Sequence, residues 1–267
     1  MKLIKVESLE VPGLEPYRTM RRPAEHRAQG LFVAEGEKVV RRLVASDLEI
    51  VSVLLTEEWL KVYSVLLESR NIEARVFVAE KELLERIVGY GLHQGIMAIG
   101  KVPAEIDLFQ TLEKVEKPRL LVAVDGIANS ENMGVLVRNC AAFGAQALIV
   151  GETSCDPYLR RAVRNSMGTV FQLRISGTES LQSTLKRLRE QFSIGIEIDL
   201  RKDVCFVFGS EGEGISRAVL DECTINARIP MDNDVDSINV AASVGVVLYE
   251  AARQRNDPRA SKPGKAG

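Results

Sequence analysis

The stretch LLVAVDGIANSENMGVLVRNCAAFGAQALIV, residues 120–150, determines the fold class that the sequence predicts. It begins with an apolar run, Leu120–Val124, that is typical of a buried strand, and a helix is predicted to start at about Glu131. A second apolar run, Ala147–Val150, follows. Nearly continuous apolar strands joined by a helix indicate a mostly parallel sheet covered by helices on both faces. We therefore predict an α/β fold.

The same alternation continues toward the C-terminus. Further strands are predicted at Val170–Leu173, Ile194–Ile198 and Val204–Phe208, and helices at Tyr158–Asn165 and Ile238–Arg253. We expect one α/β domain over residues 118–255, followed by a polar, disordered tail over residues 256–267.

Upstream of residue 118 the pattern predicts a second, smaller α/β domain over residues 1–103. Short β-rich runs alternate with amphipathic stretches, and the predicted elements are the strands Leu31–Ala34, Ile50–Leu55, Ala74–Val78 and Ile96–Val102 with the helices Glu37–Ala45 and Glu57–Glu68. The stretch 104–117 is polar and lies between Pro103 and Pro118, so it is predicted to be a linker.

Composition narrows the function classes. A chain of 267 residues with 46% hydrophobic content can fill two cores. It has no run of eighteen apolar residues and no apolar stretch over residues 1–10, so we expect a cytoplasmic protein. Its four cysteines lie far apart without a C-x-x-C pair, which argues against disulfides and a zinc site and predicts reduced packing residues. We expect no metal.

The formal net charge of -2 lacks the basic excess common in nucleic-acid-binding proteins, so any RNA site must be local. Two local basic clusters exist, one between Tyr17 and Arg42 and one at residues 160–164. The candidate RNA-binding residues from these clusters are Arg18, Arg21, Arg22, Arg41, Arg160 and Arg164. Solvated helix faces explain either cluster equally well when it is taken alone.

The first candidate site segment is residues 125–144, DGIANSENMGVLVRNCAAFG, which turns out of a strand and opens a helix. Asn129, Ser130 and Asn132 are residues that cap helices, and the free amides of a helix N-terminus attract anions such as phosphate. Arg138 follows two turns later. A plain helix start with a surface arginine is the structural alternative.

The second segment, FVFGSEGEGI at residues 206–215, is a buried strand that runs into a glycine-rich loop. Glycine allows a backbone to pass close to a ligand. The order G-x-x-G-x-G differs from the dinucleotide fingerprint, and no G-K-[ST] follows, so a P-loop is excluded. A simple turn between a strand and a helix remains the alternative.

The third segment, IPMDNDVDSINVAASVG at residues 229–245, is predicted to be an extended piece, an acidic turn and a helix start. Ser237 is a plausible N-cap. Ala241, Ala242, Ser243 and Gly245 are small, so another element packs close to this helix, and a tight core or a subunit interface explains them equally well.

Together and in this order, the three segments resemble the SpoU (TrmH-like) family of RNA ribose 2′-O-methyltransferases, which belongs to the SPOUT class. The resemblance covers residues 118–254. Phe32–Val40 (FVAEGEKVV) and His93–Ala98 (HQGIMA) resemble the small RNA substrate-binding domain that many members carry, which is related in shape to ribosomal proteins that bind kinked RNA.

The resemblance implies a deep trefoil knot in the C-terminal domain and a homodimer whose active site uses both chains. It implies S-adenosyl-L-methionine as cofactor, bound in bent form near Gly209, Gly214, Ile229, Met231 and Ile238. It implies a catalytic set of Asn132, Arg138, Glu211, Ser237 and Asn239. The expected activity is methylation of a ribose 2′-hydroxyl in structured RNA, with ribosomal RNA favoured over transfer RNA.

Guanidinium stays protonated in proteins, so we expect Arg138 to anchor a phosphate and stabilise the developing alkoxide rather than act as the base, with Glu211 orienting it. Between Gly168 and Gly209 the chain is shorter than is usual for the family, in a segment that walls the adenosine pocket. A non-catalytic RNA-binding or ribosome-assembly factor is therefore the main alternative, and a methyltransferase for a protein or small molecule is a weaker one.

Overall fold

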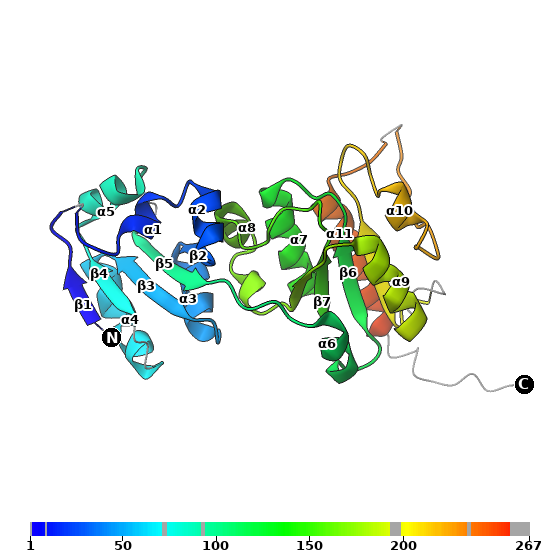
Figure 1. Cartoon of the computed structure of the whole chain (residues 1–267), viewed down its shortest axis with the longest axis horizontal. Coiled ribbons are helices and arrows are strands. Elements are labelled where there is room, and N and C mark those ends of the chain that lie inside the picture. Colours follow the sequence, from blue (N-terminus) through cyan, green and yellow to red (C-terminus); the bar gives the residue numbers. More distant parts are fainter. Residues whose placement is uncertain are drawn as a thin grey trace, which may run out of the picture. The chain divides into compact units, whose positions relative to one another are not determined.

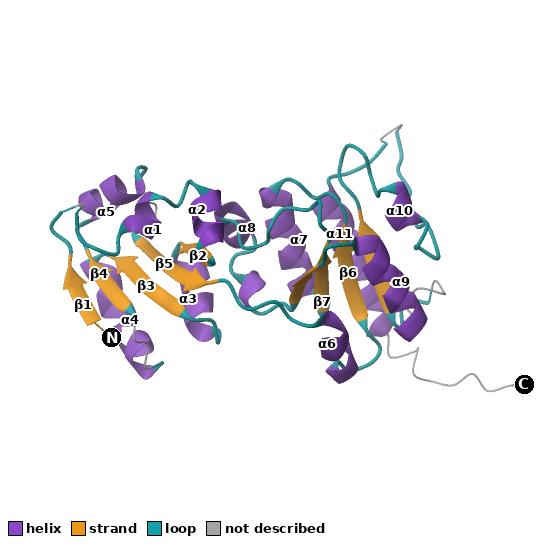
Figure 2. Cartoon of the chain, viewed as in Figure 1, coloured by secondary structure: helices purple, strands orange, loops and turns teal. Residues whose placement is uncertain are grey.

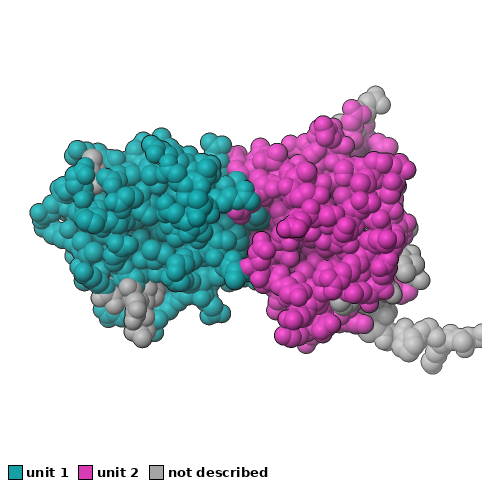
Figure 3. Space-filling model, viewed as in Figure 1, with its two compact units in different colours: residues 1–104, 157–172 teal, residues 105–156, 173–267 magenta. Residues whose placement is uncertain are grey.

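The computed structural model describes residues 2–8, 10–70, 74–91, 94–192, 199–233 and 236–256. The predicted strand Ile194–Ile198, residues 257–267 of the predicted tail, and His93 lie outside the described residues. The chain divides into two compact units, shown in Figure 3. Unit 1 comprises residues 1–104 and 157–172, and unit 2 comprises residues 105–156 and 173–267.

Unit 1 contains a five-stranded mixed sheet in the order β1-β4-β3-β5-β2 (Figure 1). The strands are β1 (Lys2–Lys5), β2 (Leu31–Glu35), β3 (Ile50–Leu55), β4 (Arg75–Val78) and β5 (Ile96–Lys101). β1, β3 and β4 run parallel, whereas β5 runs antiparallel to both of its neighbours, β3 and β2. The carboxyl ends of β2, β3 and β4 therefore lie at the same sheet edge as the amino end of β5.

The helices of unit 1 are α1 (Glu15–Arg18), α2 (Pro23–Ala28), α3 (Glu37–Ala45), α4 (Glu57–Ser69), α5 (Lys81–Val88) and α8 (Arg160–Asn165), with the 3-10 helix η1 (Thr169–Phe171). Apolar residues spaced three and four apart place one face of each longer helix in the core. In α3, for example, this face is Val39, Val40, Leu43 and Val44, all of which are buried.

Residues 157–172 belong to unit 1, although they lie within the predicted C-terminal domain. We predicted the helix at residues 158–165 as part of the C-terminal domain, but α8 packs against β2 of unit 1. The ring of Phe32 lies 5.5 Å from that of Tyr158 and 5.2 Å from that of Phe171, measured between centroids. These aromatic contacts bury apolar surface that unit 1 otherwise exposes.

The predicted strand Val170–Leu173 is also wrong, because residues 169–171 form η1. Gly168 adopts the left-handed conformation, with φ of 80°, directly before this turn of helix. Val170 and Phe171 are buried in it. A short apolar run has too few residues to distinguish a strand from a buried turn by periodicity.

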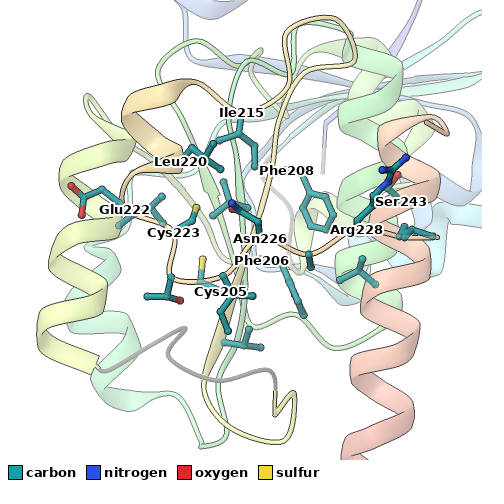
Figure 4. Close-up of a pocket in the computed structure, with 18 of the residues that line it drawn as sticks. Cys205, Phe206, Phe208, Ile215, Leu220, Glu222, Cys223, Asn226, Arg228 and Ser243 are labelled. Carbon is teal, nitrogen blue, oxygen red and sulfur yellow. The ribbon is translucent and has the colours of Figure 1, made fainter. Parts of the chain in front are cut away.

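Unit 2 contains a fully parallel four-stranded sheet in the order β8-β7-β6-β9, of which Figure 2 labels β6 and β7. Its strands are β6 (Leu120–Val124), β7 (Ala147–Val150), β8 (Ile175–Gly177) and β9 (Val204–Phe208). Its helices are α6 (Leu108–Lys114), α7 (Ser130–Ala142), α9 (Leu181–Phe192), α10 (Arg217–Leu220) and α11 (Val240–Arg255). One core cluster joins α6, α9 and α10 to one face of the sheet. On the opposite face, α7 and α11 pack against each other (Figure 4).

Helix α6 corrects the predicted linker over residues 104–117. Asp107 caps this helix, because its carboxylate accepts hydrogen bonds from the amides of Phe109 at 2.9 Å and Gln110 at 3.1 Å. Leu108 and Leu112 lie one turn apart and are buried in the core of unit 2. Two buried leucines in seven residues give too weak a helical period to be recognised in the sequence.

Candidate active site

The turn that follows β6 positions the start of α7. The carboxylate of Asp125 is buried and accepts hydrogen bonds from the amide of Ser216 at 2.8 Å and the hydroxyl of Thr153 at 3.3 Å. The side chain of Asn129 caps α7 by accepting from the amides of Glu131 at 2.8 Å and Asn132 at 3.3 Å. The side chain of Asn132 therefore projects from the first turn of a fixed helix.

The glycine-rich loop after β9 closes on itself. Ser210 and Gly214 exchange two backbone hydrogen bonds, each 3.0 Å long. A Cβ atom on Gly209 would lie 2.1 Å from the carbonyl carbon of Gly214, so only glycine fits at position 209. Gly214 has a φ of 73°, in the left-handed region that glycine adopts without strain. The closed loop presents Glu211 on its exposed side.

Asn132, Glu211 and Asn239 form one hydrogen-bonded cluster. The Glu211 Oε1 atom accepts from the Asn132 amide at 3.0 Å and from the Asn239 amide at 2.5 Å. The Asn239 amide also donates to the Asn132 Oδ1 atom at 3.0 Å. Three segments separated in the sequence, one residue from each predicted motif, thus meet at a single carboxylate oxygen.

Asn239 also starts α11, and this corrects a prediction. Its side chain accepts a hydrogen bond from the amide of Ala241 at 3.0 Å, so Asn239 is the N-cap, and α11 begins at Val240. We predicted Ser237 as the cap and Ile238 as the start of this helix. Ser237 is instead exposed in the segment that precedes the cap.

Arg138 lies on the exposed face of α7 and makes no hydrogen bond or ion pair with any residue that the structure describes. Within one chain, Glu211 makes no hydrogen bond or ion pair with Arg138, and its Oε1 atom accepts from the two asparagine amides. A contact between Glu211 and Arg138 of a second chain stays a prediction. Arg138 is available to a ligand or to a second chain.

A cavity of about 530 Å³ lies around β9 in unit 2 (Figure 4). Three of the predicted cofactor-binding residues line it: Ile229, Met231 and Ile238. Gly209 and Gly214 are not among its lining residues, but Phe208 and Ile215, their neighbours in the chain, are. Most of the lining is apolar, which suits an aromatic ring system held by packing and by hydrogen bonds to its edge.

Several lining residues were not identified from the sequence. The cavity is also lined by Cys205 of β9 and by Cys223 and Arg228, since residues 223–229 run past β9 without pairing with it. Burial raises the pKa of the Cys205 thiol to about 12, so this residue lines the cavity as an uncharged group. No local pattern marks these residues, since their placement depends on the path of a loop.

All six candidate RNA-binding arginines lie in unit 1, and each has a partner there. The partners and distances are Arg18 with Glu15 at 3.2 Å, Arg21 with the Gly89 carbonyl at 3.1 Å, Arg22 with Glu25 at 3.0 Å, Arg41 with Glu37 at 2.6 Å, and Glu35 with Arg160 at 2.7 Å and Arg164 at 3.6 Å. The ion pairs with Glu15, Glu25, Glu35 and Glu37 lower the positive potential that the paired arginines present to a phosphate.

The two basic clusters meet at Tyr90. The guanidinium carbons of Arg21 and Arg160 lie 5.1 Å and 5.0 Å from the centroid of its ring. The Arg160 guanidinium also donates to the Tyr90 hydroxyl at 2.6 Å. Burial, with the nearby Glu35 carboxylate, raises the pKa of Tyr90 to about 12. One arginine from each basic cluster, Arg21 and Arg160, thus contacts the same aromatic ring.

Within the described ranges, no helix is both long and apolar enough to cross a membrane. Nor do the described histidines, cysteines and acidic residues form a group of three or more that could hold a metal ion.

Comparison with known proteins gives matches over both units. Residues 119–249 match the family described as SpoU rRNA Methylase. Residues 33–104 match a second family, described as RNA 2′-O ribose methyltransferase substrate binding. A 23S rRNA (guanosine-2′-O-)-methyltransferase, RlmB, of Xylella fastidiosa is 30% identical over 70% of this chain and 80% of its own length. An uncharacterized tRNA/rRNA methyltransferase of Mycobacterium tuberculosis is 26% identical over 91% of this chain and 89% of its own.

Among solved structures, an AdoMet-bound rRNA methyltransferase from Sinorhizobium meliloti superposes with a TM-score of 0.77. The two sequences are 22% identical, and the superposition covers 95% of this chain and 98% of that structure. This likeness shows that the α/β fold with its mostly parallel sheet is shared.

Proposed function

Because this chain belongs to the SpoU family of RNA methyltransferases, we propose that it transfers a methyl group from S-adenosylmethionine to a ribose 2′-hydroxyl of ribosomal RNA. The observation that carries the proposal is the Asn132–Glu211–Asn239 cluster beside the apolar cavity of unit 2. The cluster and the cavity share their chain segments, since Ser237 and Ile238 line the cavity and Asn239 follows them directly.

The residues present fit S-adenosylmethionine. Ile229, Met231 and Ile238 would hold its adenine by packing, and the closed loop at Gly209 brings bare backbone to the same region. When bound, the cofactor supplies an electrophilic methyl group. The relative from S. meliloti with the same fold was solved with AdoMet bound, which supports this assignment.

The chain's own polar groups would orient the ribose. Asn132 and Asn239 are held by Glu211, so their free amide atoms have fixed directions for bonding a sugar or phosphate oxygen. Arg138 would bind the neighbouring phosphate and stabilise the alkoxide that forms on the 2′-oxygen. A guanidinium does not accept a proton, so the hydroxyl proton would pass to phosphate or to water.

We also propose the finer properties that the family implies, a homodimer and a trefoil knot in unit 2. The exposed surface of α7 and α11 supports the homodimer, because Val135, Val246 and Tyr249 on these helices are 38%, 48% and 58% exposed. Arg138 lies one turn after Val135 on α7, so it would face the partner chain. The knot rests on the shared fold.

Unit 1 would recognise the folded RNA by its shape, through the arginines grouped at Tyr90. Ribosomal RNA is the favoured substrate because the chain matches an rRNA methylase family and a 23S rRNA methyltransferase. A cytoplasmic location follows from that substrate.

Two measurements test the proposal. Calorimetry of the full chain with S-adenosylmethionine should show one saturable site per chain. Mapping of ribose methylation across total RNA, with and without the gene, should show loss of a single 2′-O-methyl mark. Binding of RNA by folded protein that does not bind the methyl donor would instead identify a non-catalytic RNA-binding factor.

A further inference from the structure

Unit 1 has a cavity of its own, which methyl transfer does not use. It has a volume of about 600 Å³ and lies where the chain leaves β3 and β4 and enters β5. These three points lie at one sheet edge because β3 and β4 run parallel and β5 runs antiparallel to β3. The volume is within the range of small-molecule pockets, about 300–1,000 Å³.

One wall of this cavity is Trp59, the single tryptophan of the chain. Its ring packs edge-on against Tyr63, with centroids 5.9 Å apart, and the Tyr63 hydroxyl donates to the Glu37 carbonyl at 3.1 Å. On another side lies Gly95, where an added Cβ atom would be in ordinary van der Waals contact with Trp59 Cδ1, at 3.8 Å. The indole is therefore held in place, and a fixed aromatic face is a platform on which an unpaired base stacks.

The charges around Trp59 decide which ligand is favoured. Glu57, Glu58 and Glu80 line the cavity together with one cation, Lys81. None of these four side chains makes a hydrogen bond or ion pair with any described residue. The lining has a net negative charge, which disfavours phosphate, and its carboxylates are acceptors only. The cavity thus suits a neutral group with several N–H donors.

We propose that this cavity binds one unstacked guanine of the RNA substrate, with its ring on Trp59 and its N–H groups bonded to the glutamates. Guanine carries two adjacent donors, N1–H and the 2-amino group, that match the two oxygens of a carboxylate. Uracil offers one donor between two carbonyl oxygens, which a carboxylate repels. The guanine must be unpaired, because in a duplex these two donors are hydrogen-bonded to the partner base.

This inference rests on the proposed RNA substrate, but it concerns recognition by unit 1 and not methyl transfer. Trp59 provides a local probe, because the tryptophan fluorescence of the full chain, excited selectively over tyrosine, comes from this one indole. The full chain is titrated, without methyl donor, with the single-stranded pentamers UUGUU, UUAUU, UUCUU and UUUUU. We expect saturable quenching by UUGUU with a dissociation constant about tenfold below that for UUUUU. Absence of quenching, or equal affinity for all four, would overturn the proposal.

Variants separate base recognition from general RNA binding. The triple change Glu57→Gln, Glu58→Gln and Glu80→Gln should bring the affinity for UUGUU to within about twofold of that for UUUUU. The control Glu68→Gln, on the exposed surface of α4 outside the cavity, should keep the preference. If the triple variant instead binds all pentamers more tightly and keeps its preference, the glutamates only repel RNA and the proposal is wrong.

The two proposals fail in different ways. Quenching with guanine preference in a protein that methylates no RNA would retain this site and reject the proposed activity. Methylation by a protein whose Trp59 does not respond to any pentamer would retain the activity and reject this site.

Discussion

At the scale of single residues, Glu211 is best described as a positioning residue. One of its carboxylate oxygens accepts hydrogen bonds from both Asn132 and Asn239, so it ties the glycine loop to the starts of α7 and α11. It makes no contact with Arg138, and the arginine must be oriented by the substrate or by a second chain.

We expect Glu211→Ala to lower kcat for RNA methylation about tenfold. A hydrogen bond to a charged group contributes about 1.5–3 kcal/mol, and the lower end of this range applies because Glu211 is exposed. The matched control is Glu213→Ala in the same loop, whose side chain makes no described hydrogen bond or ion pair. Single-turnover assays and calorimetry with the methyl donor would measure both variants. Equal rates for the two would show that the cluster does not position the reacting groups.

Arg138 has a different expected pattern, because it acts on charge that develops during the reaction. Arg138→Ala should lower kcat by about 10²–10³, the usual cost of removing one such donor. Arg138→Lys keeps the charge but loses the two-pronged geometry, so it should retain part of the rate. RNA affinity is measured in parallel. Complete loss of activity in the lysine variant, with unchanged RNA binding, would contradict the proposed role.

At the scale of elements, the glycine loop allows a sharp comparison of two neighbouring glycines. A Cβ at position 209 would meet the backbone of Gly214 and Ile215 at 2.1–2.3 Å, whereas a Cβ at position 212 would meet nothing within 4 Å. Gly209→Ala should therefore open the loop and abolish measurable donor binding, and Gly212→Ala should leave the dissociation constant within about twofold. Calorimetry tests this, and donor binding by the Gly209→Ala variant would show that the closed loop is unnecessary.

The elements that sequence predicted well are those fixed by their own residues. The bounds of α3, β3, β6, β7 and β9 agree with the predictions, because long apolar runs and a clear helical period specify them locally. The helix α8 was predicted within two residues of its bounds, but the short elements α6 and η1 were misassigned because distant contacts determine them, such as the packing of Phe171 on Phe32. Helix α9 was missed altogether.

The candidate site shows the same division. The resemblance to the SpoU family implied Asn132, Glu211 and Asn239 as site residues, and the structure brings these three together. The asparagine partners of Glu211 were not foreseen, because they come from two segments far from it in the sequence. The cavity between Cys205 and Arg228 forms because residues 223–229 pass β9, and sequence periodicity does not predict the path of such a loop.

Helix α2 gives unit 1 a pH dependence. His26 in α2 is buried, and its Nε2 atom lies 3.3 Å from the Thr19 hydroxyl. Burial lowers its pKa below the ordinary value of 6.5, so the unfolded chain binds this proton more readily. The resulting stability is present above pH 6.5 and is lost as pH falls through the lowered pKa.

We therefore expect the free energy of unfolding of the full chain to decrease between pH 7 and pH 5. The variant His26→Gln, which keeps polar groups for Thr19, should show a flatter curve over this interval. Urea unfolding at a series of pH values measures both. Parallel curves for the two proteins would mean that His26 titrates alike in the folded and unfolded states.

At the scale of the whole molecule, the exposed apolar residues of α7 and α11 decide whether Arg138 acts alone or across a dimer. Tyr249 is 58% exposed and packs edge-on against Phe143, with ring centroids 6.1 Å apart. The change Tyr249→Asp should shift the protein to monomers in sedimentation experiments and remove its activity, because burying an unpaired charge in an apolar interface is costly. Val65→Asp, at an exposed apolar position in α4 that is 74% accessible, is the control and should leave the oligomeric state unchanged.

Mixing two inactive variants distinguishes action within one chain from action across two. If Arg138 serves the partner's site, a dimer of one Arg138→Ala chain and one Gly209→Ala chain contains one site with an intact loop and an intact arginine. Random mixing makes about half of the dimers mixed, so about a quarter of the wild-type activity should return. If Arg138 serves its own chain, every site lacks one of the two parts and no activity returns. The purified variants are mixed, unfolded and refolded together, and their methylation activity is then assayed. Folded dimers without recovered activity would reject a shared site.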